Sequence, residues 1–296
     1  MKVLVYLNGG LGNQLFQIFT LLGYSFRNRT PFFIPYKKRD QTSQHGFPRP
    51  TYWDNFLKYL VPFTEKNPEK EPFEVFKEMG FNYRQIPNFM LDARFMINPQ
   101  LANQNKLLYG YWQSPKYFDD QKEKIFRLMR LSTFQLEMEA SHKLYLKENV
   151  ISMHFRIGDY KYAQDHHPLL KLKYYKDCLN YYVEKLGTTK LNVLVFNEEC
   201  DDETVSKYIK FLKKSFRDTR FMRLKGSLPD WKSMVLMSCC SHNIIANSTF
   251  SWWGAYFNQN KDKIVCYPTV WFGPAQGKKD TTDLFMEDWV KIECKQ

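Results

Sequence analysis

Apolar and polar positions follow a regular rhythm in the second half of the chain. From residue 150 onward, short apolar runs alternate with longer stretches in which apolar residues recur at helical spacing. The expected strands cover 150–156, 191–196, 220–223, 243–246 and 263–267, and the expected helices fall near 173–187, 201–215, 230–241 and 249–258. Strands that alternate with helices in this way predict a parallel sheet covered on both faces.

The first half of the chain is less regular. Expected strands cover 2–7, 31–35 and 106–112, and helical patterns start at Leu15, run from 115 to 131 and continue to 147. Residues 36–105 are crowded with Pro, Asn, Lys and aromatic residues and show no clean period. This region is either an ordinary loop-rich insertion or a surface that recognises a binding partner. We expect a boundary near 145–149, which gives two α/β domains over 1–147 and 148–296.

Three chemically distinctive residues follow the apolar run 150–153. His154, Arg156 and Asp159 lie within six positions of one another, and Gly158 allows a bend between them. Ligands of open α/β sheets bind beyond the carboxyl ends of the strands. The planar fork of an arginine suits two-point contact with a phosphate. The alternative is a strand that ends in an exposed basic turn.

Two further segments join an expected strand to an expected helix. After the first strand, Gly10, Gly12 and Asn13 lie in a glycine-rich loop, where backbone amides can approach an anion. No Gly-Lys-Ser/Thr follows, and the third position of a dinucleotide fingerprint falls on Leu15. After 243–246, the run Ser248, Thr249 and Phe250 opens an aromatic helix. These residues could cap the helix or bind a phosphate.

Together the segments resemble the α-1,2-fucosyltransferase family of inverting glycosyltransferases, in its bacterial and viral form. Four motifs occur in the family's order, at residues 9–17, 110–118, 154–160 and 247–256. The His-x-Arg and Ser-Thr-Phe elements are also similar, more distantly, to those of protein O-fucosyltransferases and α-1,6-fucosyltransferases. Two positions depart from the pattern. Ile157 stands where many members have a second Arg, and Ser233 stands where an acid that contacts the nucleoside is common, with Asp230 as the nearest substitute.

The resemblance implies two Rossmann-like domains that face a cleft, the GT-B-like arrangement. It implies transfer of L-fucose from GDP-β-L-fucose to the 2-hydroxyl of a terminal β-galactoside, in one inverting displacement. The N-terminal domain would face the acceptor, and the C-terminal domain would bind GDP-fucose. Another nucleotide sugar or linkage on the same scaffold, or an inactive sugar-binding relative, remains an alternative.

The same resemblance assigns roles to individual residues. Arg156 would neutralise the leaving diphosphate, together with Ser248, Thr249 and the amide of Phe250. Asn13, with the amides of Gly10 and Gly12, would close the donor cleft from the N-terminal domain. His154 would donate to the nucleotide or organise Arg156. Asp159 would be the general base or would hold Arg156 in position, and the sequence does not decide between these roles.

Composition narrows the partners of the protein. The net charge of +12 over 296 residues indicates an anionic partner, namely a nucleotide sugar, a membrane surface or nucleic acid. Surplus Lys on amphipathic helices explains the charge equally well. No nucleic-acid motif is present, so we expect no nucleic-acid partner. Peripheral contact with a membrane is compatible with this charge.

The sequence lacks the motifs of a metal site, of a membrane span and of a signal peptide. The sequence has no Asp-x-Asp motif of the kind that metal-dependent transferases use, so we expect neither a metal nor another cofactor. The six cysteines include no Cys-x-x-Cys pair. No apolar run approaches the ~20 residues of a membrane span. Met1 and Lys2 lead directly into the first strand, which leaves no room for a signal peptide. We therefore expect a cytoplasmic protein.

Overall fold

The computed structural model describes residues 1–36, 41–42, 48–49, 51–66, 72–89, 104–147 and 149–294. The chain divides into two compact units, one formed by Met1–Ser132 with Lys279–Met286 and the other by Thr133–Lys278 with Glu287–Gln296. The division therefore precedes the boundary expected near 145–149. Helix α5 (Leu131–Ser141) accounts for the difference, because Gln135 near its start donates to the Ser238 hydroxyl and the Phe257 carbonyl in the second unit.

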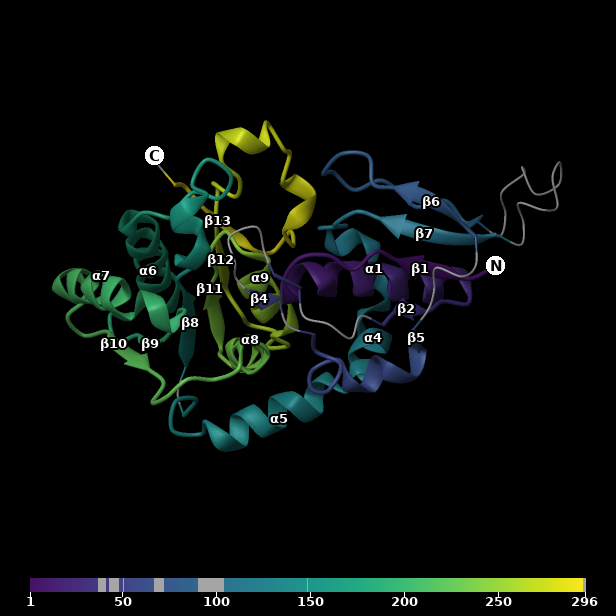
Figure 1. Cartoon of the computed structure of the whole chain (residues 1–296). Helices are drawn as coiled ribbons and strands as arrows, with labels where there is room; N and C mark the ends of the chain where they lie inside the picture. Colours follow the sequence, from purple (N-terminus) through teal and green to yellow (C-terminus); the bar gives the residue numbers. More distant parts are fainter. Residues whose placement is uncertain are drawn as a thin grey trace. The chain divides into compact units, whose positions relative to one another are not determined.

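A parallel sheet of six strands forms the centre of the second unit (Figure 1). Its strands are β8 (Val150–His154), β9 (Asn192–Phe196), β10 (Arg220–Arg223), β11 (His242–Ile244), β12 (Val265–Pro268) and β13 (Val290–Ile292). The helices are α6 (Leu172–Leu186), α7 (Asp202–Ser215), α8 (Asp230–Ser238) and α9 (Thr249–Phe257). The structure confirms the five strands and four helices expected from the periodicity, with small shifts at their ends. It adds β13, which the pattern did not indicate.

The order of strands in this sheet is β10-β9-β8-β11-β12-β13. The chain builds outward from β8 in one direction and then starts again at β11, on the other side of β8. The strand order therefore reverses between β8 and β11. In open α/β sheets this reversal leaves a crevice at the carboxyl ends of the two strands, and ligands bind there.

Tyrosines of α6 fix the strands that border this reversal. The hydroxyl of Tyr174 donates to the Ile245 carbonyl at 2.6 Å, and that of Tyr175 donates to the His154 carbonyl at 3.2 Å. Burial raises the pKa of both phenols well above the usual value, so they remain protonated donors. Buried tyrosines need such partners, and here the partners hold the ends of β8 and β11 in place.

The first unit contains a smaller parallel sheet in the order β1-β7-β6. It comprises β1 (Val3–Val5), β7 (Asn105–Tyr109) and β6 (Phe73–Lys77), and helix α1 (Leu11–Asn28) follows β1. Short paired strands are β2 (Ile34–Pro35) with β5 (Thr64–Glu65), and β3 (Gln41–Thr42) with β4 (Pro48–Arg49). Two 3-10 helices (Pro115–Tyr117 and Asp119–Gln121) and α4 (Lys122–Met129) fill the region expected to be helical from 115 to 131.

Strand β6 lies inside the stretch 36–105, for which no period was evident. Its pairing with β7 shows that this stretch contributes to the sheet and is more than an insertion of loops. The second alternative, a surface that recognises a binding partner, involves parts of this stretch at residues 37–40, 43–47, 50, 67–71 and 90–103 that lie outside the described residues. Their role stays a prediction.

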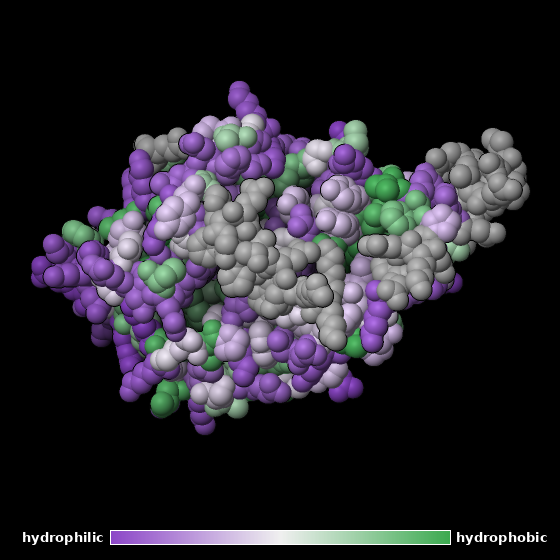
Figure 2. All heavy atoms as spheres, viewed as in Figure 1, coloured by the Kyte–Doolittle hydropathy of each residue, from purple (hydrophilic) through white to green (hydrophobic). Residues whose placement is uncertain are grey.

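The surface of the second unit is largely hydrophilic over α6 and α7, at the left of Figure 2. Lysines on these helices pair with acids one turn away, as Lys173 does with Asp177 and Lys207 with Glu203. These lysines therefore lie on solvated helix faces, where neighbouring acids balance their charge. In the described parts of the chain, no helix has the length and apolar character needed to cross a membrane.

Candidate functional site

Two of the sequence motifs meet where the strand order reverses in the second unit. Strands β8 and β11 are paired, with Met153 opposite Ile244, so the residues that follow them start from the same edge of the sheet. The rings of His154 and Phe250 are 5.5 Å apart between centroids, and the Tyr160 hydroxyl donates to the Asn247 carbonyl at 3.2 Å. The fold thus brings 154–160 and 247–250 together, as ligand binding at this edge requires.

Arg156 lies between two carboxylates in this crevice. One terminal nitrogen, Nη2, donates to Asp159 and the other, Nη1, donates to Glu198, in the loop after β9. The guanidinium also stacks on the Tyr160 ring, 4.9 Å from its centroid. Burial opposes the positive charge, but the surrounding Tyr160, Glu198 and Asp159 outweigh this effect and raise the pKa of Arg156. The site therefore holds a permanent cation whose fork is oriented by its neighbours.

The turn after Arg156 is held by a fully buried carboxylate. The Gly158 amide donates to Asp201 Oδ2 at 2.6 Å, and Lys161 Nζ lies 2.5 Å from Asp201 Oδ1. Gly158 adopts φ of +22°, and a Cβ there would lie 2.5 Å from Glu198 Oε2. The positive φ favours a glycine, and the missing Cβ leaves room for the Glu198 carboxylate in its present position.

His154 is a neutral, enclosed side chain at the end of β8. The residue is 5% exposed, and burial together with the nearby Arg156 charge lowers the pKa of the imidazole to about 3. Its Nδ1 atom is buried and has no hydrogen-bond partner among the residues that the structure describes. The imidazole can therefore serve as a neutral donor or acceptor at physiological pH.

Helix α9 begins at the same edge. Ser248 is its N-cap, and the Ser248 hydroxyl accepts a hydrogen bond from the Phe250 amide at 3.3 Å. Thr249 and Phe250 form the first turn and are both partly exposed. The amino end of a helix, with its unsatisfied amides and positive dipole end, favours anions.

The glycine-rich loop lies at the carboxyl edge of the sheet in the first unit. Gly9 adopts φ of +81°, and Gly10 is the N-cap of α1. The buried Gln17 accepts from the Asn8 amide at 2.9 Å and donates to the Gly110 carbonyl at 3.2 Å. It thereby ties the loop after β1 to the segment after β7.

Asn13 lies in the first turn of α1. Its Oδ1 accepts from Gln113 Nε2 at 3.0 Å. The motifs 9–17 and 110–118 are therefore joined directly, and Gly10, Gly12 and Asn13 share one edge of the first unit.

Glu198 and Asp201 contact the site but were not among the residues expected from the sequence. Asp201 is the N-cap residue of α7, but its side chain makes no cap bond and instead accepts from the Gly158 amide. Both acids follow β9, the strand next to β8. The sequence signal that could have indicated them is the presence of polar residues at the ends of two strands that pair in parallel.

The two positions that depart from the family pattern, Ile157 and Ser233, lie in different structural environments. Ile157 is 5% exposed and belongs to the core cluster of the second unit, so it faces away from the site that Arg156 faces. Ser233 is partly buried in α8, and Asp230 is exposed in the first turn of that helix. The carboxylate of Asp230 accepts from the Trp231 amide at 2.7 Å.

One group of side chains in the second unit has the composition of a metal site. Possible ligand atoms of Glu198, Cys200 and Asp201 lie within 4.8 Å of one another. The two carboxylates already hold positively charged partners, Arg156 for Glu198 and Lys161 for Asp201. Their charge is therefore balanced by the protein itself.

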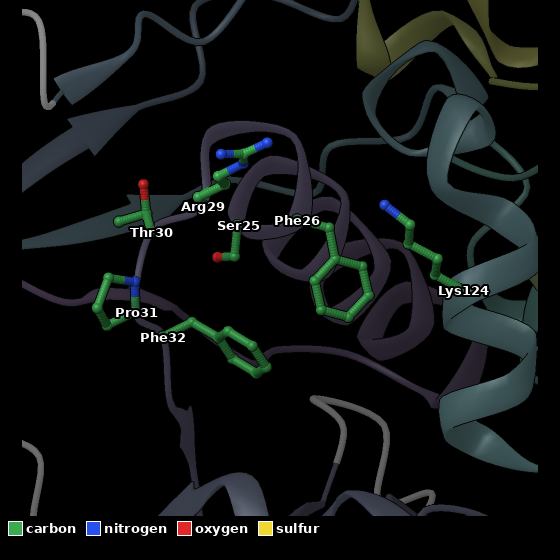
Figure 3. Close-up of a pocket in the computed structure, with 7 residues that line it drawn as sticks. All are labelled: Ser25, Phe26, Arg29, Thr30, Pro31, Phe32 and Lys124. Carbon is green, nitrogen blue, oxygen red and sulfur yellow. The ribbon is translucent and has the colours of Figure 1, made fainter.

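A cavity of about 490 Å³ in the first unit lies apart from these residues (Figure 3). It is at the carboxyl end of α1, opposite the glycine-rich loop, and is lined by Ser25, Phe26, Arg29, Thr30, Pro31, Phe32 and Lys124. It contains none of the residues that the sequence motifs indicated.

Comparisons with known proteins agree with the geometry. Residues 1–293 match the model of the family described as Glycosyl transferase family 11. The chain is 26% identical over 322 residues to the O-antigen biosynthesis glycosyltransferase WbnK of Escherichia coli, covering 97% of this chain and 99% of that protein. It is 28% identical over 301 residues to an alpha-1,2-colitosyltransferase of Escherichia coli, covering 98% of this chain and 99% of that protein.

A solved structure supports the fold. The glycosyl transferase family 9 protein from Veillonella parvula aligns with a TM-score of 0.50 and 12% identity, over 100% of this chain and 87% of that one. This likeness, with parallel sheets in both units, confirms the α/β, GT-B-like fold class expected from the sequence.

Proposed function

The chain belongs to glycosyl transferase family 11, and we propose that it transfers L-fucose from GDP-β-L-fucose to the 2-hydroxyl of a terminal β-galactoside, with inversion. The observation that supports this most directly is the position of Arg156 at the strand reversal, two residues after His154, whose ring lies 5.5 Å from that of Phe250 at the start of α9. A cation and a helix amino end at one edge suit a diphosphate leaving group.

In this proposal the second unit binds the donor. Arg156 contacts the β-phosphate, and the Thr249 hydroxyl and the Phe250 amide contact the same diphosphate. Ser248 orders the first turn of α9 so that these donors face the anion. His154, which is neutral, donates to the nucleotide or supports Arg156. The ion pair between Asp159 and Arg156 favours the positioning role for Asp159 over the role of general base.

The proposed reaction is a single displacement. The 2-hydroxyl oxygen of the acceptor bonds to C1 of fucose as the bond from C1 to the β-phosphate oxygen breaks, and the hydroxyl proton leaves to a base. Negative charge develops on GDP, and preorganised donors around such charge contribute about 3–4 kcal/mol each to stabilising the transition state. The first unit faces the acceptor and supplies Asn13 and the amides of Gly10 and Gly12.

The proposal includes no metal ion. Arg156 and the amides at the start of α9 provide the positive charge that a metal would otherwise bring to the diphosphate. The charge balance around Glu198 and Asp201 supports this view, because their carboxylates pair with cationic side chains.

A second donor is favoured by one of the comparisons. The 28% identical relative is named for transfer of colitose in α-1,2 linkage, so a GDP-colitose donor is the alternative for this chain. The α-1,2 linkage is common to both proposals, and only the donor sugar differs.

Transfer assays with a panel of sugar nucleotides test the proposed function. We expect GDP-fucose to give an α-1,2-linked product on β-galactosides, with undiminished turnover in excess chelator. Turnover with GDP-colitose alone would select the second donor. Loss of activity with chelator, followed by rescue with Mg²⁺ or Mn²⁺, would contradict the metal-free scheme. If no GDP-sugar is turned over on any galactoside, the proposed function is wrong.

Two substitutions at the start of α9 separate phosphate binding from helix capping. Thr249→Ala removes one proposed hydrogen bond to a charged group and should weaken GDP binding about 10-fold, with little change in melting temperature. Ser248→Ala removes the cap, which costs ~0.5–2 kcal/mol of stability, and should lower both the melting temperature and GDP affinity. Calorimetric titrations and thermal melts of the two variants provide the measurement. Unchanged GDP affinity in both would leave only the capping role.

A further inference from the structure

The two carboxylates that hold Arg156 differ in their freedom to move. The side chain of Asp159 is 13% exposed, whereas that of Glu198 is 42% exposed. Asp159 follows directly after Gly158, whose amide is fixed by the buried Asp201. Glu198 is on the separate loop after β9 and has the longer side chain. Asp159 is therefore the fixed partner of the guanidinium, and Glu198 is the partner that can turn toward solvent.

The Glu198 carboxylate occupies a position beside Arg156 that suits an anion. Its carboxylate reaches Nη1 of Arg156 while its other oxygen rests against Gly158, where the missing Cβ leaves room. A carboxylate and a phosphate compete for the same N–H groups of a guanidinium. A diphosphate that binds Arg156 through this nitrogen must therefore displace Glu198 or bind beside its negative charge.

We propose that Glu198 is a positioning residue that substitutes for the donor diphosphate on Arg156 in the empty enzyme, turns away when the donor binds, and returns as GDP leaves. This inference rests on the proposed function, because it assumes that Arg156 binds the diphosphate. Glu198 keeps the guanidinium oriented and neutralised between turnovers. The arrangement lowers the affinity for GDP and so favours product release.

Glu198→Gln tests the proposal, because it keeps the size of the side chain and removes the competing charge. We expect GDP to bind about 3- to 10-fold more tightly in calorimetric titrations, in the range of effects of single charges near a binding site. Inhibition by GDP should strengthen by a similar factor, and the KM for the donor should fall. A merely structural role would not raise affinity, since a disturbed loop weakens binding.

Two matched variants complete the experiment. Glu199→Gln makes the same charge change at the exposed neighbouring residue and should leave GDP affinity unchanged. Asp159→Asn removes the fixed partner of Arg156 and should weaken GDP binding. Circular dichroism and thermal melts show whether each variant is folded, and Glu198→Ala provides a second test of the same position.

Each outcome separates this inference from the proposed function. GDP binding by Glu198→Gln and Glu198→Ala that is equal to or weaker than wild type, while Arg156→Ala loses binding, overturns the role of Glu198 alone. Equal tightening in Glu199→Gln reduces the effect to general charge and also overturns it. Wild-type protein that does not bind GDP overturns the proposed function, and this inference with it.

Discussion

Replacing Arg156 with Ala is expected to lower the rate of transfer about 100- to 1,000-fold, the usual effect of removing one preorganised donor from developing negative charge. The guanidinium is the cation at the strand reversal, and Asp159, Glu198 and the Tyr160 ring together fix its plane. The fold should survive, because Glu198 can turn into solvent once its partner is lost. We expect a local cost of about 1–3 kcal/mol from the less exposed Asp159.

Arg156→Lys should recover little of this loss. An ammonium group is a single point of charge and cannot contact two groups in one plane as the guanidinium does. Steady-state transfer assays measure the effect, with circular dichroism and thermal melts as the control for folding. Near wild-type turnover in a folded Arg156→Ala protein would falsify the assignment of this residue to the leaving group.

Much of the second unit could be predicted from local patterns. Buried parallel strands are continuous apolar runs, and the helices between them have apolar residues at helical spacing. For this reason β8 and β9 lie close to the expected ranges. The cap of α9 was also predictable, since a serine directly before an apolar helical run favours the N-cap position.

Other features depend on contacts that a local pattern does not contain. Strand β6 alternates only weakly, and its identity comes from pairing with β7, about 30 residues further along the chain. The boundary of the units is set by Gln135 and by the return of Lys279–Met286 to the first unit. In that return, Asp283 accepts from the Tyr83 amide at 2.9 Å, a contact between residues far apart in sequence.

In the candidate site, too, some residues are predictable from a local motif and others are not. His154, Arg156 and Asp159 are close in sequence, so one motif indicates all three. Glu198 approaches Arg156 only because β9 lies beside β8, and the sequence alone does not give this order of strands. The resemblance to a family identified the residues with a proposed contact to the donor. The structure adds the acids that hold them in place.

Asp201→Ala is expected to damage both stability and transfer. The carboxylate of Asp201 is fully buried and binds both the Gly158 amide and Lys161. Its removal leaves a buried N–H group without a partner and an ion pair broken. We expect a loss of about 3 kcal/mol in the free energy of unfolding, or roughly 5–10 °C in melting temperature.

Transfer by Asp201→Ala should fall even below the melting transition, because the turn through Gly158 determines where Asp159 holds Arg156. Asp201→Asn provides the informative comparison. Its amide oxygen can still accept from the Gly158 N–H, but its amide nitrogen is a donor and cannot accept from Lys161. Most of the transfer activity should therefore return, with a smaller loss of stability than in Asp201→Ala. Asp202→Asn, at the exposed neighbouring acid that pairs with Arg223, controls for charge at the start of α7. If Asp201→Ala melts and turns over like wild type, the turn after Arg156 is held by other contacts.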